Sequence, residues 1–306
     1  FPIQETTDGP YRSQTPGMMH ACGHDAHTTC LLGAAKVLSA HRADFGGEVR
    51  FLFQPAEEIG QGAKPFVEAG VLDGADRVFG LHVAPDLPIG TVGLKPGLNN
   101  AAVDLFSIQV HGKSAHVAQP HLGQTVVALQ ALVTRLTSPV EPVIIGVGKL
   151  QAGTTYNALA GSAVLEGTTR TISQESRARV REQITRTARN IADIYGGRAE
   201  VQWTDITAAL INDPQACQEA AAAAKLLGEG VRVITDRSLS LCGDNFAEYL
   251  LHTPGAYAYL GSGNPALPNT LSSLHSEDFD VDEKALTLGA GLYAGYALSR
   301  LTASAR

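Results

Sequence analysis

One short stretch of the sequence has an unusual density of groups that can bind a metal ion. Residues Met19 to His27 read MHACGHDAH and contain one thiol, three imidazoles and a carboxylate. Ionisable groups in a protein interior must be paired or must bind an ion, because leaving them bare costs several kcal/mol each. Cys22 and His24 flank Gly23 just before a helical pattern, so both side chains can point to one place. Alone, this pair fits a metal site and a buried cysteine beside a helix cap equally well.

Two adjacent carboxylates follow a pattern that is typical of a buried strand. The sequence QPAEE, residues 54–58, comes directly after VRFLF, residues 49–53. Where a strand of an α/β sheet ends in a loop, that loop borders the crevice in which ligands bind. Glu57 and Glu58 can then have different roles, in which one binds a metal and the other acts as a base. A solvated turn is the alternative, and the placement after a strand favours a functional site.

Two further histidines are informative only in combination. His82 lies inside the apolar pattern VFGLHV, and His275 lies in LHSEDFD before the last helical pattern. Alone, His82 is explained more simply as a hydrogen-bonded core residue, and His275 as a residue of a surface loop. With Cys22, His24 and Glu58, however, they offer one sulfur, three nitrogens and a carboxylate, and thiolate and imidazole suit zinc and its neighbours. Five ligands are too many for one catalytic zinc with an open position, and they suit two metals that share a ligand.

The elements that must position these residues alternate between strand and helix. This order is typical of an α/β fold with a mostly parallel sheet flanked by helices, in which ligands gather where strands end in loops. We therefore expect residues 1–100 and 212–306 to form one metal-binding domain in two pieces. Its predicted strands are Val49–Phe53, Arg77–Val83, Val231–Ile234 and Ala256–Leu260, and its predicted helices include Thr28–Ala40 and Asp282–Leu301.

The segment between these two pieces has a different order of elements. Residues 101–211 read as strand, helix, strand, strand, helix and strand, which is the βαββαβ order of the ferredoxin-like α+β unit. Its second helix is predicted from Gln174 and ends before Gly196 and Gly197, as glycines end helices. We expect this segment to be a smaller domain inserted into the α/β domain.

Composition argues against two classes of partner. The net charge is −7 and no basic run is long enough to neutralise a phosphate backbone, so nucleic acid is not expected. The longest apolar runs are far shorter than the roughly 20 residues that span a membrane, so no membrane is expected either. The four cysteines lack the paired spacing of a secreted disulfide framework, which favours the cytoplasm. Because the chain opens with Phe1, we also expect residues before it.

The motifs described above occur together in one known family. MHACGHDAH, FQPAEE, GLHV, GKSAHVAQPH and the region of His275 resemble the co-catalytic metallopeptidases that include aminoacylases, carboxypeptidase G and succinyl-diaminopimelate desuccinylase. The chain is most similar to the hippurate hydrolases and indoleacetyl-amino-acid hydrolases, in which a cysteine replaces an aspartate that bridges two metals. The resemblance covers essentially the whole chain, in the family's order.

This resemblance implies a dinuclear metal centre and a catalytic base. Two divalent cations, zinc or manganese, would hold a water between them and lower its pKa from near 16 towards 7. Glu57 would be the general base that takes a proton from that water. The residues that would bind the cations are Cys22, His24, Glu58, His82 and His275.

The resemblance also implies a substrate and an assembly. His116 is similar to the histidine that reaches a substrate carbonyl across a dimer, and Asn157 and Arg170 are similar to groups that hold the substrate's carboxylate. The implied function is hydrolysis of the amide bond of small N-acyl amino acids, such as hippurate-like, N-acetyl or indoleacetyl conjugates. The inserted domain would act as a lid and would mediate a homodimer.

The sequence departs from the family at two places. The opening residues 1–4, FPIQ, match only the second half of a stretch that usually ends an upstream strand, so we expect upstream strands of the metal-binding domain to be absent. Residues 244–246 read DNF where the subgroup usually has EDF. The alternatives that remain are a metal-binding or ligand-binding relative without turnover, a peptidase or desuccinylase of the same family, and a thiol enzyme with Cys22 as nucleophile.

Overall fold

The computed structural model describes residues 1–112, 142–153, 160–194 and 196–303. Its first sheet, the mixed sheet, has the strand order β1–β10–β2–β9. Strands β1 (Val78–Pro88) and β10 (Gly255–Gly263) are parallel, and so are β2 (Thr91–Gly93) and β9 (Arg232–Ile234), whereas β10 and β2 are antiparallel. The sheet is therefore mostly parallel, and the predictions of β1, β9 and β10 are confirmed.

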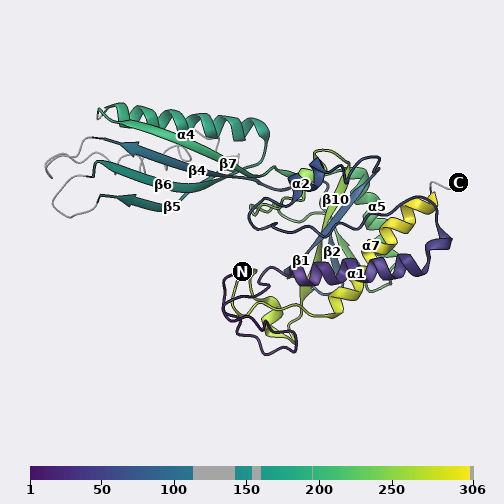
Figure 1. The fold of residues 1–306 in the computed structure, drawn as a ribbon. Coiled ribbons are helices and arrows are strands. Elements are labelled where there is room, and N and C mark those ends of the chain that lie inside the picture. The colour runs from purple at the N-terminus through teal and green to yellow at the C-terminus, as the bar shows by residue number, and fades with distance from the viewer. Residues whose placement is uncertain (113–141, 154–159, 195, 304–306) are drawn as a thin grey trace.

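Three helices share one core with the mixed sheet. They are α1 (His24–Ala40), α5 (Pro214–Lys225) and α7 (Lys284–Ala303), and Figure 1 shows α1 and α7 crossing beside the sheet. Fully buried side chains of this core include Cys30 from α1, Leu260 from β10 and Leu292 from α7. The helix predicted at Thr28–Ala40 begins earlier, at His24, so that the last residue of the Cys–Gly–His motif lies in the first turn of α1.

The prediction of a buried strand at Val49–Phe53 is wrong. None of these residues belongs to a strand, and Phe53 is 44% exposed. A strand requires a hydrogen-bonded neighbour roughly 4.7–4.9 Å away. Instead, the segment and β1 both line a cavity of about 860 Å³, and no described strand pairs with the segment. The apolar pattern therefore predicted an extended chain but could not supply its partner.

Side chains satisfy the backbone donors along the edge of β1 that the mixed sheet leaves unpaired. The backbone N–H of Val83 donates to Nε2 of His27 over 3.0 Å, and the N–H of Leu81 donates to the hydroxyl of Tyr293 over 3.2 Å. Buried backbone donors without an acceptor are costly, so these two contacts stabilise a strand edge that no described strand covers.

The second sheet is antiparallel and has the order β5–β6–β4–β7. One helix, α4, packs on it through Val180 and Ile184, which meet Phe106 and Leu165 in one core. Figure 1 shows this sheet and α4 extending away from the mixed sheet. The helix predicted before β5 falls within residues 113–141, outside the described part. The elements are β4 (Ala102–His111), β5 (Ile144–Ala152), β6 (Ser162–Thr171), α4 (Gln174–Ile194) and β7 (Arg198–Thr207).

Both chain connections between the two sheets run through a short two-stranded ribbon. Strand β3 (Gly97–Asn100) leads towards β4, and β8 (Leu210–Asn212) leads back and pairs antiparallel with β3. Asn212 fixes the ribbon to the mixed sheet, because its side chain exchanges two hydrogen bonds with the backbone of Tyr257 on β10. The sequence did not predict β2, β3 or β8, which have only three or four residues each.

The remaining elements are short. Among the described helices, none has both the length and the hydropathy needed to cross a membrane. The short elements are α2 (Ala63–Glu68), α6 (Ala247–Leu250) and the 3-10 helices η1 (Arg42–Asp44) and η2 (Pro268–Leu271).

Candidate metal centre

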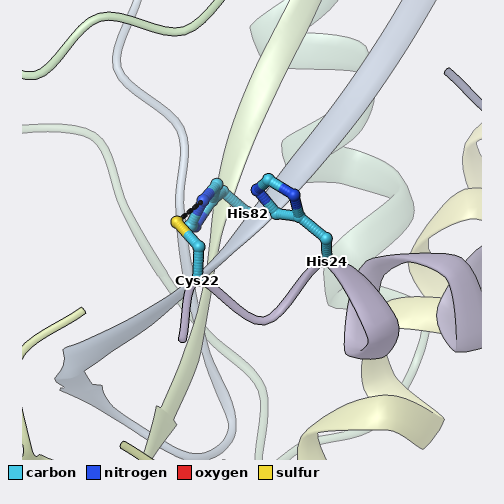
Figure 2. Close-up of side chains that lie close together, drawn as sticks. All are labelled: Cys22, His24 and His82. Carbon is cyan, nitrogen blue, oxygen red and sulfur yellow. Dashed lines mark hydrogen bonds between the residues drawn. The ribbon is translucent and has the colours of Figure 1, made fainter. Parts of the chain in front are cut away.

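The five predicted metal ligands lie together, although they come from distant parts of the sequence. Cys22 occupies the turn before α1 and His24 the first turn of that helix, while His82 lies on β1. Figure 2 shows these three side chains, with the sulfur of Cys22 directed at the ring of His82. Glu58 comes from the loop after residues 49–53, and His275 comes from the loop before α7. We call this set of five residues the ligand cluster.

The sulfur of Cys22 lies at the middle of the ligand cluster. It is 3.4 Å from Nε2 of His82 and 3.3 Å from Nε2 of His275, and the residue is only 7% exposed. The turn that places it needs a glycine next in the chain. Gly23 has a φ of 75°, and a Cβ there would lie 2.5 Å from a side-chain carbon of Val83.

The tautomer of His82 follows from its hydrogen bond. Its Nδ1 is 2.7 Å from the carbonyl oxygen of Val83, which can only accept, so Nδ1 must carry the proton. In the neutral ring, Nε2 then presents its lone pair towards Cys22. A backbone carbonyl that orients the other ring nitrogen in this way is usual for metal-binding histidines.

His275 is held in an uncommon backbone conformation. Its φ is 66°, in the left-handed region, which costs a residue other than glycine roughly 1–2 kcal/mol. Its N–H donates to the carbonyl of Ala21 over 2.7 Å, and its ring packs against that of Phe1 at 4.2 Å between centroids. These contacts direct Nε2 towards Cys22. Among the described residues, one other non-glycine residue has a positive φ, and this is Ala56, next to Glu57. The two residues with this uncommon backbone conformation therefore both lie at the metal centre.

Glu58 connects the two sides of the ligand cluster. One carboxylate oxygen is 3.4 Å from Nε2 of His24, and the other is 3.8 Å from Nε2 of His275. Among the described residues, donor atoms within 4.8 Å of one another form three groups. Two share the Cys22 sulfur, one with His24 and His82 and one with Glu58 and His275, and the third consists of His24, Glu57 and Glu58. Sulfur, nitrogen and carboxylate donors in two overlapping groups fit two divalent cations of the zinc type with a common thiolate ligand.

Glu57 lies beside the ligand cluster in an environment that suits a base. Its Oε2 is 4.0 Å from Nε2 of His24, and its Oε1 accepts from the backbone N–H of Asn245 over 3.3 Å. Burial, followed by the negative charges of Asp244 and Glu58, raises the pKa of Glu57 to about 8. A pKa near neutrality is what a group needs to take and return a proton at physiological pH.

The electrostatics of the centre favour the binding of cations. Burial and the negative charges of Glu58 and Glu57 raise the pKa of the Cys22 thiol. Burial and the charge of His82 lower the pKa of His24. Acidic groups that oppose one another's ionisation are stabilised as anions when a cation enters between them.

The third imidazole of the sequence MHACGHDAH has a structural role. Burial and the charges of His82 and His24 lower the pKa of His27 well below its usual value, so the ring is neutral. Its Nε2 accepts the backbone N–H of Val83, which leaves that nitrogen unable to bind a metal. His27 is not among the residues predicted to bind the cations.

The predicted substrate-binding residues are only partly within the described structure. Arg170 lies on β6, and its Nη1 donates to the carbonyl of Leu241 over 3.3 Å, three residues before Asp244. This contact brings the second sheet to the loop beside Glu57, although it does not place Arg170 against the ligand cluster. His116 and Asn157 fall outside the described residues.

Gln54, Asp244 and Asn245 lie near Glu57 and were not predicted to act at the centre. Gln54 donates from Nε2 to Oδ1 of Asn245 over 3.0 Å and accepts the hydroxyl of Tyr249 over 2.7 Å. Asp244 accepts the hydroxyl of Tyr257 over 2.5 Å. The departure at residues 244–246 was visible in the sequence, and Gln54 belongs to the QPAEE motif, but the contact between them depends on the fold.

Comparison with known proteins agrees with this geometry. Residues 1–299 match the model of peptidase family M20/M25/M40. The chain is 40% identical over 297 residues to an N-acetyl-L-cysteine deacetylase of Bacillus subtilis, a match that covers 94% of this chain and 68% of the relative. It is 33% identical over 309 residues to the IAA-amino acid hydrolase ILR1-like 4 of Arabidopsis thaliana. This match covers 96% of this chain and 69% of the relative.

Solved structures give the same result. The YXEP protein of Bacillus subtilis, described as a dinuclear metal binding peptidase from the M20 family, superposes with a TM-score of 0.84 at 38% identity, over 98% of this chain and 78% of that one. A putative aminohydrolase of Staphylococcus aureus superposes with a TM-score of 0.90 at 31% identity, over 98% of this chain and 79% of that one. This chain therefore belongs to peptidase family M20/M25/M40 and is a hydrolase.

Proposed function

We propose that this hydrolase cleaves the amide bond of small N-acyl amino acids. The observation that carries the proposal is the position of Glu57, a half-buried carboxylate with a raised pKa, beside five donors that fit two divalent cations. The dinuclear description of the YXEP protein and the deacetylase and amino acid hydrolase names of the relatives support it. Zinc or manganese is the proposed metal, because both accept the sulfur, nitrogen and carboxylate donors present.

The proposed chemistry assigns one proton path to this chain. When bound, two divalent cations polarise the amide carbonyl and make water acidic enough to attack it near neutral pH. Glu57 takes the proton of the attacking water and later delivers it to the nitrogen of the leaving amine. Asn245 keeps the carboxylate of Glu57 in place through its backbone N–H. Cys22, His24, Glu58, His82 and His275 orient the reacting groups by holding the cations.

Three residues of the inserted segment are proposed to bind the substrate. A guanidinium matches a carboxylate in a two-point fork, so Arg170 would select substrates with a free α-carboxylate. Asn157 would hold the same carboxylate, and His116 would donate to the oxyanion, a contact of a kind that contributes roughly 3–4 kcal/mol. We also propose that residues 1–100 and 212–306 form the metal-binding domain and that residues 101–211 form a lid that mediates a homodimer. A cytoplasmic location accords with four free cysteines.

The test combines a substrate panel with one substitution. Purified protein loaded with zinc or with manganese is assayed on N-acetyl, N-benzoyl and indoleacetyl amino acids and on the same amides without the carboxylate. We expect turnover only of the carboxylate-bearing substrates. Glu57→Gln should keep both cations and lower kcat by about 10²–10⁴-fold. Activity of this variant within a few-fold of the parent would refute the assignment of the base.

Two outcomes would support other functions. Tight binding of the substrates without hydrolysis, at full metal content, would indicate a binding protein. Activity that survives a chelator but is lost on alkylation of thiols would indicate a thiol enzyme.

A further inference from the structure

The loop that carries Glu57 has few backbone restraints of its own. The segment before it, residues 49–53, belongs to no strand, and α2 after it has only six residues. Within the loop, the N–H of Gly60 donates to the carbonyl of Glu57, and the N–H of Gln61 donates to that of Ala56. The backbone of Ala56 is left-handed, with a φ of 58°, which an alanine adopts only when its surroundings impose it. The conformation of this loop must therefore be fixed from outside.

A second chain segment supplies that restraint. Asn245, only 2% exposed, lies just before α6, and its backbone N–H donates to Oε1 of Glu57. Its side chain accepts from Gln54 at the start of the loop, and Gln54 in turn accepts from Tyr249 on α6. Three hydrogen bonds thus join the loop to the region of α6. We call Gln54, Asn245 and Tyr249 the amide clamp.

The chemistry of Gln54 suits this position. A carboxamide donates from its nitrogen and accepts at its oxygen, and Gln54 uses the two groups on different partners, Asn245 and Tyr249. A leucine has neither group, and a glutamate at neutral pH cannot donate. The loop also folds tightly around this side chain, since a Cβ on Gly62 would lie 2.5 Å from Nε2 of Gln54.

We propose that Gln54 and Asn245 are positioning residues for Glu57. Gln54 holds the side chain of Asn245, and Asn245 holds the carboxylate of Glu57 through its backbone N–H. This inference rests on the proposed function of Glu57 as the general base. Neither amide contacts the ligand cluster through a described hydrogen bond, so the clamp acts on the base and not on the retention of the cations.

The test uses Gln54→Leu and Asn245→Ala in the fully metal-loaded protein. For both, kcat should fall about 10–100-fold, as displacement of a catalytic group by about 1 Å does, while KM changes less than about threefold. Metal content should stay at two cations per chain. Gln61→Leu is the matched control, because it removes an exposed amide from the same loop and should leave kcat unchanged.

Two further measurements separate positioning from general destabilisation. In a Glu57→Gln background, Gln54→Leu should produce no further loss of rate, because the group that it positions is already absent. An equal loss in both backgrounds would overturn the inference. Tyr249→Phe, which removes one hydroxyl and keeps the Gln54–Asn245 contact, should lower kcat only a few-fold. Tyr249→Phe provides a second test if Gln54→Leu does not fold. If kcat is unchanged in both single variants, Tyr249→Phe and Asn245→Ala, the inference is also overturned.

The outcomes distinguish this inference from the proposed function. If Glu57→Gln abolishes turnover and Gln54→Leu does not affect it, the clamp is wrong and the base stands. If Glu57→Gln leaves turnover intact, the proposed function of Glu57 fails regardless of the clamp.

Discussion

The two sides of the candidate metal centre are held in different ways. On one side, which we call the thiol side, Cys22, His82 and His275 are oriented by a tight turn, a paired strand and backbone carbonyls. On the other, the carboxylate side, Glu57 and Glu58 lie on a loop after an unpaired segment. This loop is joined to the region of α6 by hydrogen bonds of the Gln54 and Glu57 side chains. Backbone pairing fixes a position firmly, whereas a few hydrogen bonds each contribute only about 1 kcal/mol. The carboxylate side should therefore be the more adjustable one.

The largest effect is expected from Cys22→Ala on the thiol side. Removing the sulfur that both donor groups share should release both cations and lower activity by more than about 100-fold, the upper limit of loss for residues that only support ligands. Metal analysis and an assay measure this. Cys30→Ala is the control, because Cys30 is also a buried thiol but contacts the backbone of α7 at Leu286. Retention of two cations by Cys22→Ala would show that the sulfur is not shared.

Removal of the cations should affect the two sides unequally. With a chelator, Glu57, Glu58 and Asp244 lose the charge that balances them, and their repulsion should loosen the loop. Hydrogen exchange of the backbone amides of residues 56–62 should become about 10-fold faster, while that of residues 21–24 should change little. An equal acceleration at both places would remove the distinction between the sides.

His27 tests how far the thiol side depends on its backbone. His27→Ala leaves the N–H of Val83 without its acceptor, so the free energy of unfolding should fall by about 1–3 kcal/mol. The two cations should remain bound, because this ring is not among the ligands. Thermal unfolding and metal analysis measure both, with the exposed His41→Ala as control. Loss of the cations at full folding would make His27 a ligand.

The smallest effect is a pH dependence in the metal-free protein. Because the pKa of Glu57 is raised to about 8 in the folded state, the folded protein keeps a proton that the unfolded chain releases near pH 4.5. The free energy of unfolding should therefore decrease as the pH rises from about 4.5 to about 8 and then level off. The full difference in pKa corresponds to about 5 kcal/mol, and solvent screening of this carboxylate, whose side chain is 26% exposed, reduces the decrease to on the order of 2 kcal/mol. Denaturant titrations across this range measure the decrease. Glu57→Gln should abolish it, and its persistence in that variant would assign it to another group.

On both sides of the centre the sequence predicted candidate residues but not the contacts that hold them. Cys22, His82 and His275, like Glu58, were predicted as ligands from residue types that suit a metal and from the strand and helix patterns around them. The strand at 49–53 was predicted wrongly, since an apolar run specifies an extended chain but not the neighbour with which it pairs. The contact of Gln54 with Asn245 joins residues 191 positions apart and depends on the completed fold. The structural role of His27 was not predicted, because only the geometry shows which of its nitrogens is engaged.

The ribbon of β3 and β8 has a consequence for how such a protein can diversify. Both chain crossings between the two sheets pass through this one narrow connection, and Asn212 fastens it to β10. Besides this ribbon, the second sheet contacts the loop beside Glu57 through hydrogen bonds of Arg170 to Leu241 and of Thr207 to the carbonyl of Asp244. Over evolutionary time, selection could exchange or reshape the second sheet and so alter the range of acceptable molecules, while the reactive centre stayed intact.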